Sequence, residues 1–168
     1  MQKSECRWRA LFLLIGAAAC YGQPPAPPTG QVPLPNWLGM GSGYSSADSP
    51  HFGGWAALAL PVSQSQGIYS YTLYQAAPVA GRAPTISTTT GVAMILRSFA
   101  TKRGTLYVLG LTTAGAAVSG TATTGAFSGG GIGVWKFPGG FTVEFGGTAE
   151  KAGAGTRPSL KLGGGWSW

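Results

Sequence analysis

The chain has 168 residues, of which 29 are glycine, 44% are hydrophobic and only 9% are charged, with a formal net charge of +7. The low charge and the 11% aromatic content exclude an ordinary disordered chain, and no Gly-X-Y period indicates collagen. Water-soluble domains carry about 25% charged residues, so this composition predicts one domain whose surface faces something other than water.

The N-terminal segment 1–22 has the pattern of a secretory signal peptide. It begins with three basic residues, Lys3, Arg7 and Arg9. The apolar run that follows, 10–21, is shorter than the roughly 20 residues of a transmembrane helix. We expect cleavage after Ala19 or after Gly22. Cys20, preceded by three alanines, leaves open the lipidation of the mature N-terminus that is typical of a bacterial lipoprotein.

Residues 23–36 form a proline-rich linker, which we interpret as an extended tether. After the expected signal peptide, the chain contains eight basic and three acidic residues. The basic residues are spread along the chain, and no basic stripe with interleaved aromatic residues is present, so a nucleic-acid partner is not expected. The acidic residues are Asp48, Glu144 and Glu150.

From residue 37 onwards the chain divides into extended segments without helical periodicity. We expect eight strands, over 37–44, 51–62, 68–74, 85–99, 105–113, 123–137, 141–147 and 159–168. The gaps between them contain 6, 5, 10, 5, 9, 3 and 11 residues, so that every second gap is short. This alternation predicts an up-and-down meander with tight turns at one end and longer loops at the other, as in outer-membrane barrels.

Within the strands, apolar residues occupy alternate positions, and the opposite positions are mostly small or polar. A soluble sandwich would place charges on its outer face. Because few charges occur in series here, we expect the apolar face to point outward, into lipid. The residues expected outside are Val92, Met94 and Leu96; Phe141, Val143 and Phe145; Tyr107, Leu109 and Leu111; and Tyr69, Tyr71 and Leu73. The bulky residues expected inside are Ile68, Ile95, Val108 and Ile132.

The last ten residues end on an aromatic side chain preceded by apolar residues at every second position. The residues in question are Leu160, Leu162, Trp166 and Trp168, with Gly164 departing from the pattern. This arrangement resembles the C-terminal strand signal of bacterial outer-membrane barrels, and residues 37–168 resemble the small barrels of the OmpA-transmembrane-domain and OmpX type. The resemblance implies an eight-stranded antiparallel transmembrane barrel, recognition by the barrel-assembly machinery, and termini and short turns in the periplasm.

Four charged residues fall on the inward positions of the expected strands. The tight turn around 138–140 pairs Lys136 with Thr142, which places Lys136 diagonally beside Glu144. Arg97 and Lys161 share the inward parity. An ionised group inside a narrow barrel needs a partner, because an unpaired buried charge is costly. We therefore expect an interior cluster of Glu144 with Lys136, joined by Arg97 or Lys161, that acts as a polar plug.

Aromatic residues gather at the expected turn end of their strands, where an interfacial girdle belongs. They are Trp135, Phe137, Phe141, Trp166 and Trp168. The glycine cluster 129–133 lacks the pattern of a phosphate-binding loop. We interpret it as a bend or as close packing against a large inward side chain, for which Trp55 and Tyr74 are candidates.

The function expected from these features is a non-enzymatic structural or interaction role in the bacterial outer membrane, with membrane lipid as a partner. Three alternatives stay open. The first is a narrow channel for small solutes, and the second is a secreted glycine-rich surface protein or lipoprotein. The third is a lipid-modifying enzyme that uses His51 beside a Ser- and Asp-containing loop. No cofactor is expected, and the mature chain has too few Cys and His residues for a metal site.

Overall fold

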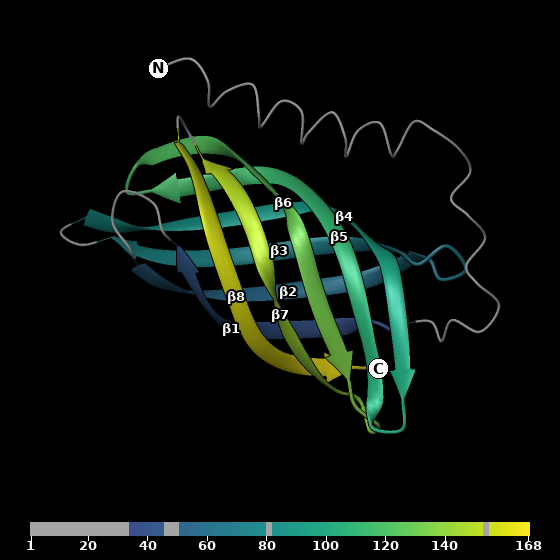
Figure 1. The fold of residues 1–168 in the computed structure, drawn as a ribbon. Coiled ribbons are helices and arrows are strands. Elements are labelled where there is room, and N and C mark those ends of the chain that lie inside the picture. Colours follow the sequence, from purple (N-terminus) through teal and green to yellow (C-terminus); the bar gives the residue numbers. More distant parts are fainter. Residues whose placement is uncertain (1–33, 46–50, 80–81, 153–154) are drawn as a thin grey trace, which may run out of the picture. The chain divides into compact units, whose positions relative to one another are not determined.

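The computed structural model describes residues 34–45, 51–79, 82–152 and 155–168. They form a closed antiparallel barrel in which each strand pairs with the next and β8 pairs with β1 (Figure 1). The strands of this described part are β1 (Trp37–Ser45), β2 (His51–Ser63), β3 (Ile68–Val79), β4 (Arg82–Thr101), β5 (Gly104–Ser119), β6 (Ala122–Lys136), β7 (Phe141–Ala152) and β8 (Gly155–Ser167). The predicted all-β, eight-stranded up-and-down barrel is confirmed. The expected signal peptide lies outside the described residues.

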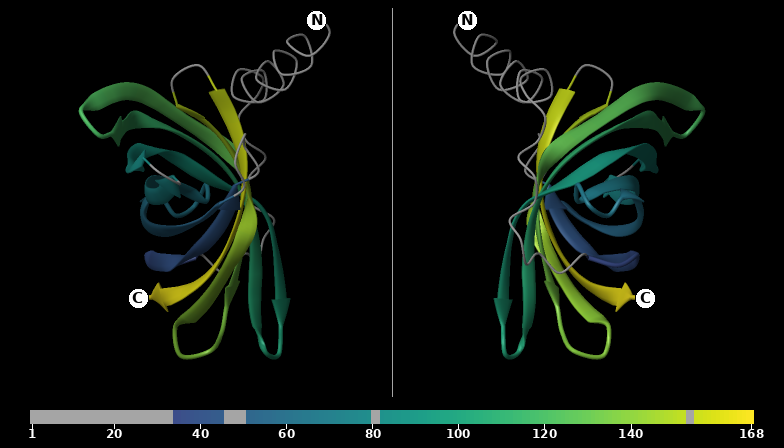
Figure 2. Two further views of the ribbon diagram at one scale, coloured as in Figure 1. Left: turned by 90° about the vertical axis from the view of Figure 1, so that its left-hand side faces the viewer. Right: turned by 90° about the vertical axis from the view of Figure 1, so that its right-hand side faces the viewer.

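The two ends of the barrel are built differently. The turn end carries residues 64–67, 102–103 and 137–140, together with the start of β1 and the end of β8. At the hairpin end, three pairs of strands, β3–β4, β5–β6 and β7–β8, run on to connections of two residues each. In Figure 1 the hairpin end lies on the left, and in Figure 2 the β5–β6 hairpin (green) reaches beyond its neighbours.

The prediction of longer loops at one end is wrong, because most of each of the segments 75–84, 114–122 and 148–158 is strand. The apolar alternation used to define the strands fades there, but pairing continues, with Ile86 opposite Val118 and Glu150 opposite Arg157. Backbone hydrogen bonds extend a ladder wherever a neighbouring strand satisfies them, and the Thr and Val residues of these segments fit a pleated surface. Gly120, with φ of 60°, allows the tight turn between β5 and β6.

The outer face of the barrel is apolar and almost free of charge. The expectation that the apolar residues of 92–96 and 141–145 face outward is confirmed: Val92, Met94, Leu96, Phe141 and Phe145 are exposed, and Val143 shares their face. Among the strand side chains that the structure describes, only Arg97 and Lys151 place a charge on this face, near opposite ends. No helix in the described residues is long and apolar enough to cross a membrane.

On β3 and β5 the predicted faces are reversed. Tyr69, Tyr71 and Leu73 are fully buried in the interior, as are Tyr107 and Leu109, while Leu111 is 5% exposed. Ile68 and Val108 therefore lie on the outer face, whereas Ile95 and Ile132 pack inside as expected. The reason is volume. An eight-stranded barrel has to be filled by its own side chains, and the tyrosines of β3 and β5 supply much of that bulk.

Candidate functional site: the barrel interior

The turn-end half of the interior is organised around Glu144 of β7, which is 1% exposed. Its carboxylate accepts one hydrogen bond from Trp37 Nε1 to Oε2 (3.2 Å) and one from the Tyr71 hydroxyl to Oε1 (3.0 Å). The two donors come from β1 and β3, so the contacts reach across the lumen. A buried carboxylate loses its hydration, and two donors aimed at its oxygens replace part of it.

Aromatic rings surround this carboxylate. The Trp37 ring lies 5.3 Å from that of Tyr69 and 6.2 Å from that of Tyr71, measured between centroids. The Tyr69 hydroxyl donates to the Leu34 carbonyl oxygen at 2.6 Å, which ties the segment before β1 to the interior. Glu144, Trp37, Tyr69 and Tyr71 together form what we call the interior plug.

Glycine on β1 and β8 makes room for the plug and for Trp55 of β2. A Cβ at Gly39 would lie 2.7 Å from Glu144 Oε2 and 3.2 Å from the Trp55 ring, and one at Gly163 would lie 2.6 Å from the same ring. The Trp55 indole nitrogen donates to the Ser42 carbonyl oxygen at 3.1 Å, which holds the ring against the adjacent strand β1. Trp55 therefore packs against these two glycines, whereas Tyr74, the other candidate, faces outward.

The glycine cluster 129–133 itself has other neighbours. Gly133 is covered on the outer face by Phe145, whose ring would lie 2.5 Å from an added Cβ. Gly130 approaches the backbone of Gly147, with an added Cβ 2.2 Å from its carbonyl oxygen. The cluster is closely packed, but the expected large inward partner is wrong: the neighbours are Phe145 on the outer face and backbone, not Trp55 or Tyr74.

The hairpin-end half of the interior holds a charged network. Lys161 of β8 is 4% exposed and stands between Gly43 and Gly146 on the neighbouring strands, so its side chain can cross the lumen. The Gln75 side-chain amide, oriented with its nitrogen towards Glu150, donates to Glu150 Oε2 (3.0 Å) and accepts from Lys161 Nζ (3.2 Å). Lys161 is also attracted electrostatically by Glu144 and Glu150.

A cavity of ≈ 50 Å³ lies beside this network, between Trp55 and the hairpin end. Its polar lining includes Gln75, Glu150, Arg157, Ser159 and Lys161, and small residues of β1, β2 and β3 form much of the remaining wall. We call it the hairpin-end cavity.

The expected interior cluster can be compared with these positions. Glu144 and Lys161 lie inside, and Lys136 pairs with the buried Thr142 as expected but is half-buried near the turn end. Glu144 takes its hydrogen bonds from Trp37 and Tyr71 rather than from Lys136. The structure does not place Arg97 in the cluster. A β-bulge after Ile95 puts it opposite Val108, on the outer face.

Sequence reasoning missed several interior residues, for two reasons. Glu150 and Arg157 have the inward parity of Glu144 and Lys161, but the expected strands stopped short of them; longer strands would have identified both. Trp37 and Tyr71 carry no such signal, since they are 107 and 73 residues away from Glu144 in the chain.

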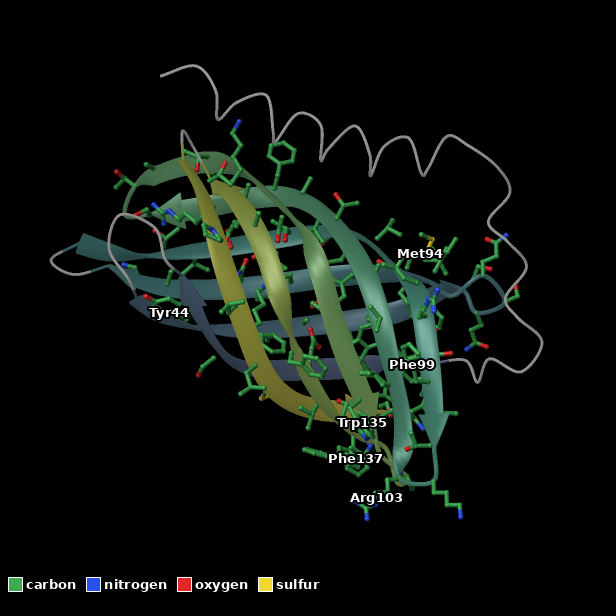
Figure 3. The ribbon with its side chains drawn as sticks, viewed as in Figure 1. Tyr44, Met94, Phe99, Arg103, Trp135 and Phe137 are labelled. Carbon is green, nitrogen blue, oxygen red and sulfur yellow. The ribbon has the colours of Figure 1, made fainter. Side chains whose placement is uncertain are left out.

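The expected girdle residues lie at the turn end. Trp135 and Phe137 have ring centroids 6.1 Å apart, and Phe137 and Phe141 are 5.8 Å apart. In Figure 3, Trp135 and Phe137 lie near Arg103 of the β4–β5 turn. Trp166 is opposite Phe141 on the adjacent strand, and both are exposed. The four residues of the expected assembly signal, Leu160, Leu162, Trp166 and Trp168, are all exposed on the outer side.

The last candidate from the sequence is His51 with its Ser- and Asp-containing loop. His51 is the first residue of β2, opposite Ser45, and the side chains of residues 45–52 lie outside the described part. In the part of the chain that the structure describes, no group of three or more His, Cys, Asp or Glu side chains could hold a metal ion.

Comparison with solved structures shows which fold this is. The chain is similar to Ail, the attachment invasion locus protein of Yersinia pestis, over 82% of its own length and all of that chain, with 11% identity and a TM-score of 0.52. A second Ail structure, in complex with the heparin analogue sucrose octasulfate, gives 12% identity and a TM-score of 0.55 over the same shares. Neisserial surface protein A matches 79% of this chain and 96% of its own, with 9% identity and a TM-score of 0.55.

The chain thus has the fold of small eight-stranded outer-membrane barrels. At these identities the likeness establishes the fold alone. No protein-family model and no curated protein sequence matches the chain.

Proposed function

We propose that this protein spans the bacterial outer membrane and has a non-enzymatic structural or interaction role there. The observation that carries the proposal is the outer face of the barrel, apolar around its circumference and with its two described charges near opposite ends. Such a face would be unstable in water and is what a lipid layer requires. The shared fold with Ail and Neisserial surface protein A supports the same placement.

The filled interior favours this role over a channel. Trp37, Tyr69, Tyr71 and Glu144 occupy the turn-end half of the lumen with almost no exposed surface. A conducting path would have to separate the Glu144 carboxylate from both of its donors. Because a buried, unpaired carboxylate is costly, the closed arrangement is favoured.

The long strands favour an interaction surface outside the membrane. A strand crosses the bilayer in about 9–11 residues, whereas β4 has 20 and β5 has 16. We place the surplus at the hairpin end, where Ile86, Val118 and Phe127 are exposed, because the residues of the expected aromatic girdle lie at the turn end. By resemblance this end faces the exterior, so paired strands rather than loops would meet a partner. Ail, the attachment invasion locus protein, gives the fold a precedent for such a role.

The proposal is tested by expressing the full chain in a Gram-negative host and washing the membranes with carbonate. We expect the protein to stay with the outer membrane and to migrate on gels as a compact form that boiling converts to an extended one. Recovery in the soluble fraction, or migration that boiling does not change, would contradict the membrane barrel and favour a secreted surface protein.

Conductance distinguishes the proposed role from the channel. The purified barrel is reconstituted in a planar bilayer beside a known porin as a positive control. We expect no stepwise conductance, because the plug closes the lumen. Reproducible single-channel steps from the folded, heat-modifiable protein would support the channel instead.

A further inference from the structure

The hairpin-end cavity contains an arrangement that the proposed role does not use. On β8, Arg157, Ser159 and Lys161 occupy alternate positions and line the same cavity. Alternate residues of a strand lie about 6.7 Å apart on one face, so two cationic side chains flank a hydroxyl along a single wall. The neighbouring strand β1 adds only Gly43 to the lining, and β3 adds two alanines beside Gln75, so much of the remaining wall has no side chain beyond a Cβ.

The charge of the lining is unbalanced. The charged side chains that line the cavity are the cations Arg157 and Lys161 and the anion Glu150. One Glu150 oxygen accepts from the Gln75 amide, and Arg157 lies opposite Glu150 in the strand register. The plug engages Glu144 through Trp37 and Tyr71. The cavity lining itself has two cations and one anion. Glu144, which is not part of the lining, also attracts Lys161, and an anionic group entering the cavity would meet both Arg157 and Lys161.

The size of the cavity limits the ligand. One water needs about 10–15 Å³ of such volume, so the ≈ 50 Å³ present accommodates a group of about three to five non-hydrogen atoms. A carboxylate with its adjacent carbon, or a phosphate, fits this volume. Trp55 closes the floor, and its indole nitrogen is already bonded to the Ser42 carbonyl oxygen, so the floor presents a ring rather than a free donor.

We propose that the hairpin-end cavity is a binding site for one small oxyanion group, a carboxylate or a phosphate, held by Arg157 and Lys161 with Ser159 between them. Arginine presents paired donors that match the two oxygens of such a group, and lysine adds a point charge. The group can be a free small anion or the terminal group of a larger molecule at the surface. The site itself does not depend on the proposed membrane role, which enters only in the direction from which the ligand arrives.

Binding is measured by titration calorimetry on the full chain folded in an uncharged detergent, with sodium acetate or inorganic phosphate replacing chloride at constant ionic strength. We expect saturable binding in about the millimolar range, as suits a ligand of so few atoms. Acetamide, which has the shape of acetate without its charge, should not bind. Equal heats with acetate and acetamide, or heats that do not saturate, would overturn the proposal.

The variant Arg157→Gln should weaken acetate binding about tenfold or more, since a charge-assisted contact is lost. Arg103→Gln, which removes a cation from the turn at the other end, is the matched control and should bind like the wild type. Lys161→Gln should also lose binding, but Lys161 is part of the buried network, so the rim residue Arg157 decides the result. Unchanged affinity in a heat-modifiable Arg157→Gln barrel would overturn the site, whatever the fractionation experiment finds.

Glucuronate separates the two sources of the anion. Tighter binding of glucuronate than of acetate indicates the terminal group of a larger molecule, whose sugar ring extends towards the hairpin end. Equal or weaker binding indicates a free small anion. Glucuronate and acetate use the same carboxylate contact, so the binding of either should be lost in Arg157→Gln.

Discussion

The two halves of the barrel interior hold their carboxylates in different ways. In the turn-end half, neutral donors on aromatic side chains bond to Glu144, and rings fill the space around it. In the hairpin-end half, the Gln75 amide links Glu150 to Lys161, and small residues leave a cavity beside them. A narrow barrel can therefore hold a charged group inside in two ways. Aromatic rings can pack around it so that no free space is left, or opposite charges can be linked across the lumen. Only the second way leaves room for a ligand.

Among the substitutions that test this difference between the two halves, the largest loss of stability is expected in the interior plug. Glu144→Ala leaves the Trp37 indole, the Tyr71 hydroxyl and the Lys161 ammonium without their shared partner. Loss of one member of a buried charged network costs about 3–5 kcal/mol. We expect a loss of that order in the free energy of unfolding, measured by urea titration in lipid vesicles with tryptophan fluorescence as the signal.

Glu144→Gln is the matched variant for this measurement. It keeps the size and one acceptor oxygen and removes the charge, so its loss should be clearly smaller than that of Glu144→Ala. Equal stability of wild type and Glu144→Ala would refute the structural role of the plug.

A smaller effect is expected from filling the space that glycine provides. In Gly39→Ala the new methyl group would lie 2.7 Å from Glu144 Oε2 and 3.2 Å from the Trp55 ring. Overpacking of this kind costs about 1–3 kcal/mol. Gly54→Ala is the control, because an added Cβ there has no atom within 4 Å. It should be neutral or slightly stabilising through the lower entropy of the unfolded chain. The same urea titration compares the two, and equal midpoints would mean that Gly39 is not required for the plug.

The smallest loss of stability is expected for a substitution in the hairpin-end half. Gln75→Ala removes the amide that links Glu150 and Lys161. Without it, these two side chains can pair with each other or with water in the cavity. A hydrogen bond contributes about 0.5–1.5 kcal/mol net, so we expect a loss near that range. Gln64→Ala, at an exposed turn position, should change nothing. A loss for Gln75→Ala as large as that of Glu144→Ala would remove the proposed difference between the two halves.

Much of the fold could be predicted from local sequence, because each strand carries its own alternation. The pairing of Lys136 with Thr142 followed from the tight turn between their strands, and the structure has that register. Strand ends could not be predicted in the same way. Towards the hairpin end, the residues of β4 and β5 pair through their backbones, and no apolar alternation marks where the strands stop.

The direction in which side chains point was harder to predict than their alternation. The apolar faces of β4 and β7 point outward, whereas Tyr69, Tyr71 and Tyr107 point inward. Alternation gives two faces but does not say which of them fills the interior. That choice depends on the total volume required inside the closed ring, which is a property of all eight strands together. The partners of Glu144 depend on the same closure, and no local pattern near residue 144 indicates them.

The closure of β8 on β1 has a consequence for how the barrel folds. Trp37 lies opposite Ser167, at the far end of the chain, so this pair forms only after every intervening hairpin is in place. Until then, Glu144 cannot reach the Trp37 indole, and in an open sheet it cannot reach Tyr71 of β3 either. If the barrel inserts into a membrane as proposed, an open sheet would carry the Glu144 carboxyl group there without its hydrogen-bond partners, at a cost that grows as the sheet moves deeper. Insertion and ring closure should therefore occur together, with the carboxylate hydrogen bonds among the last contacts to form.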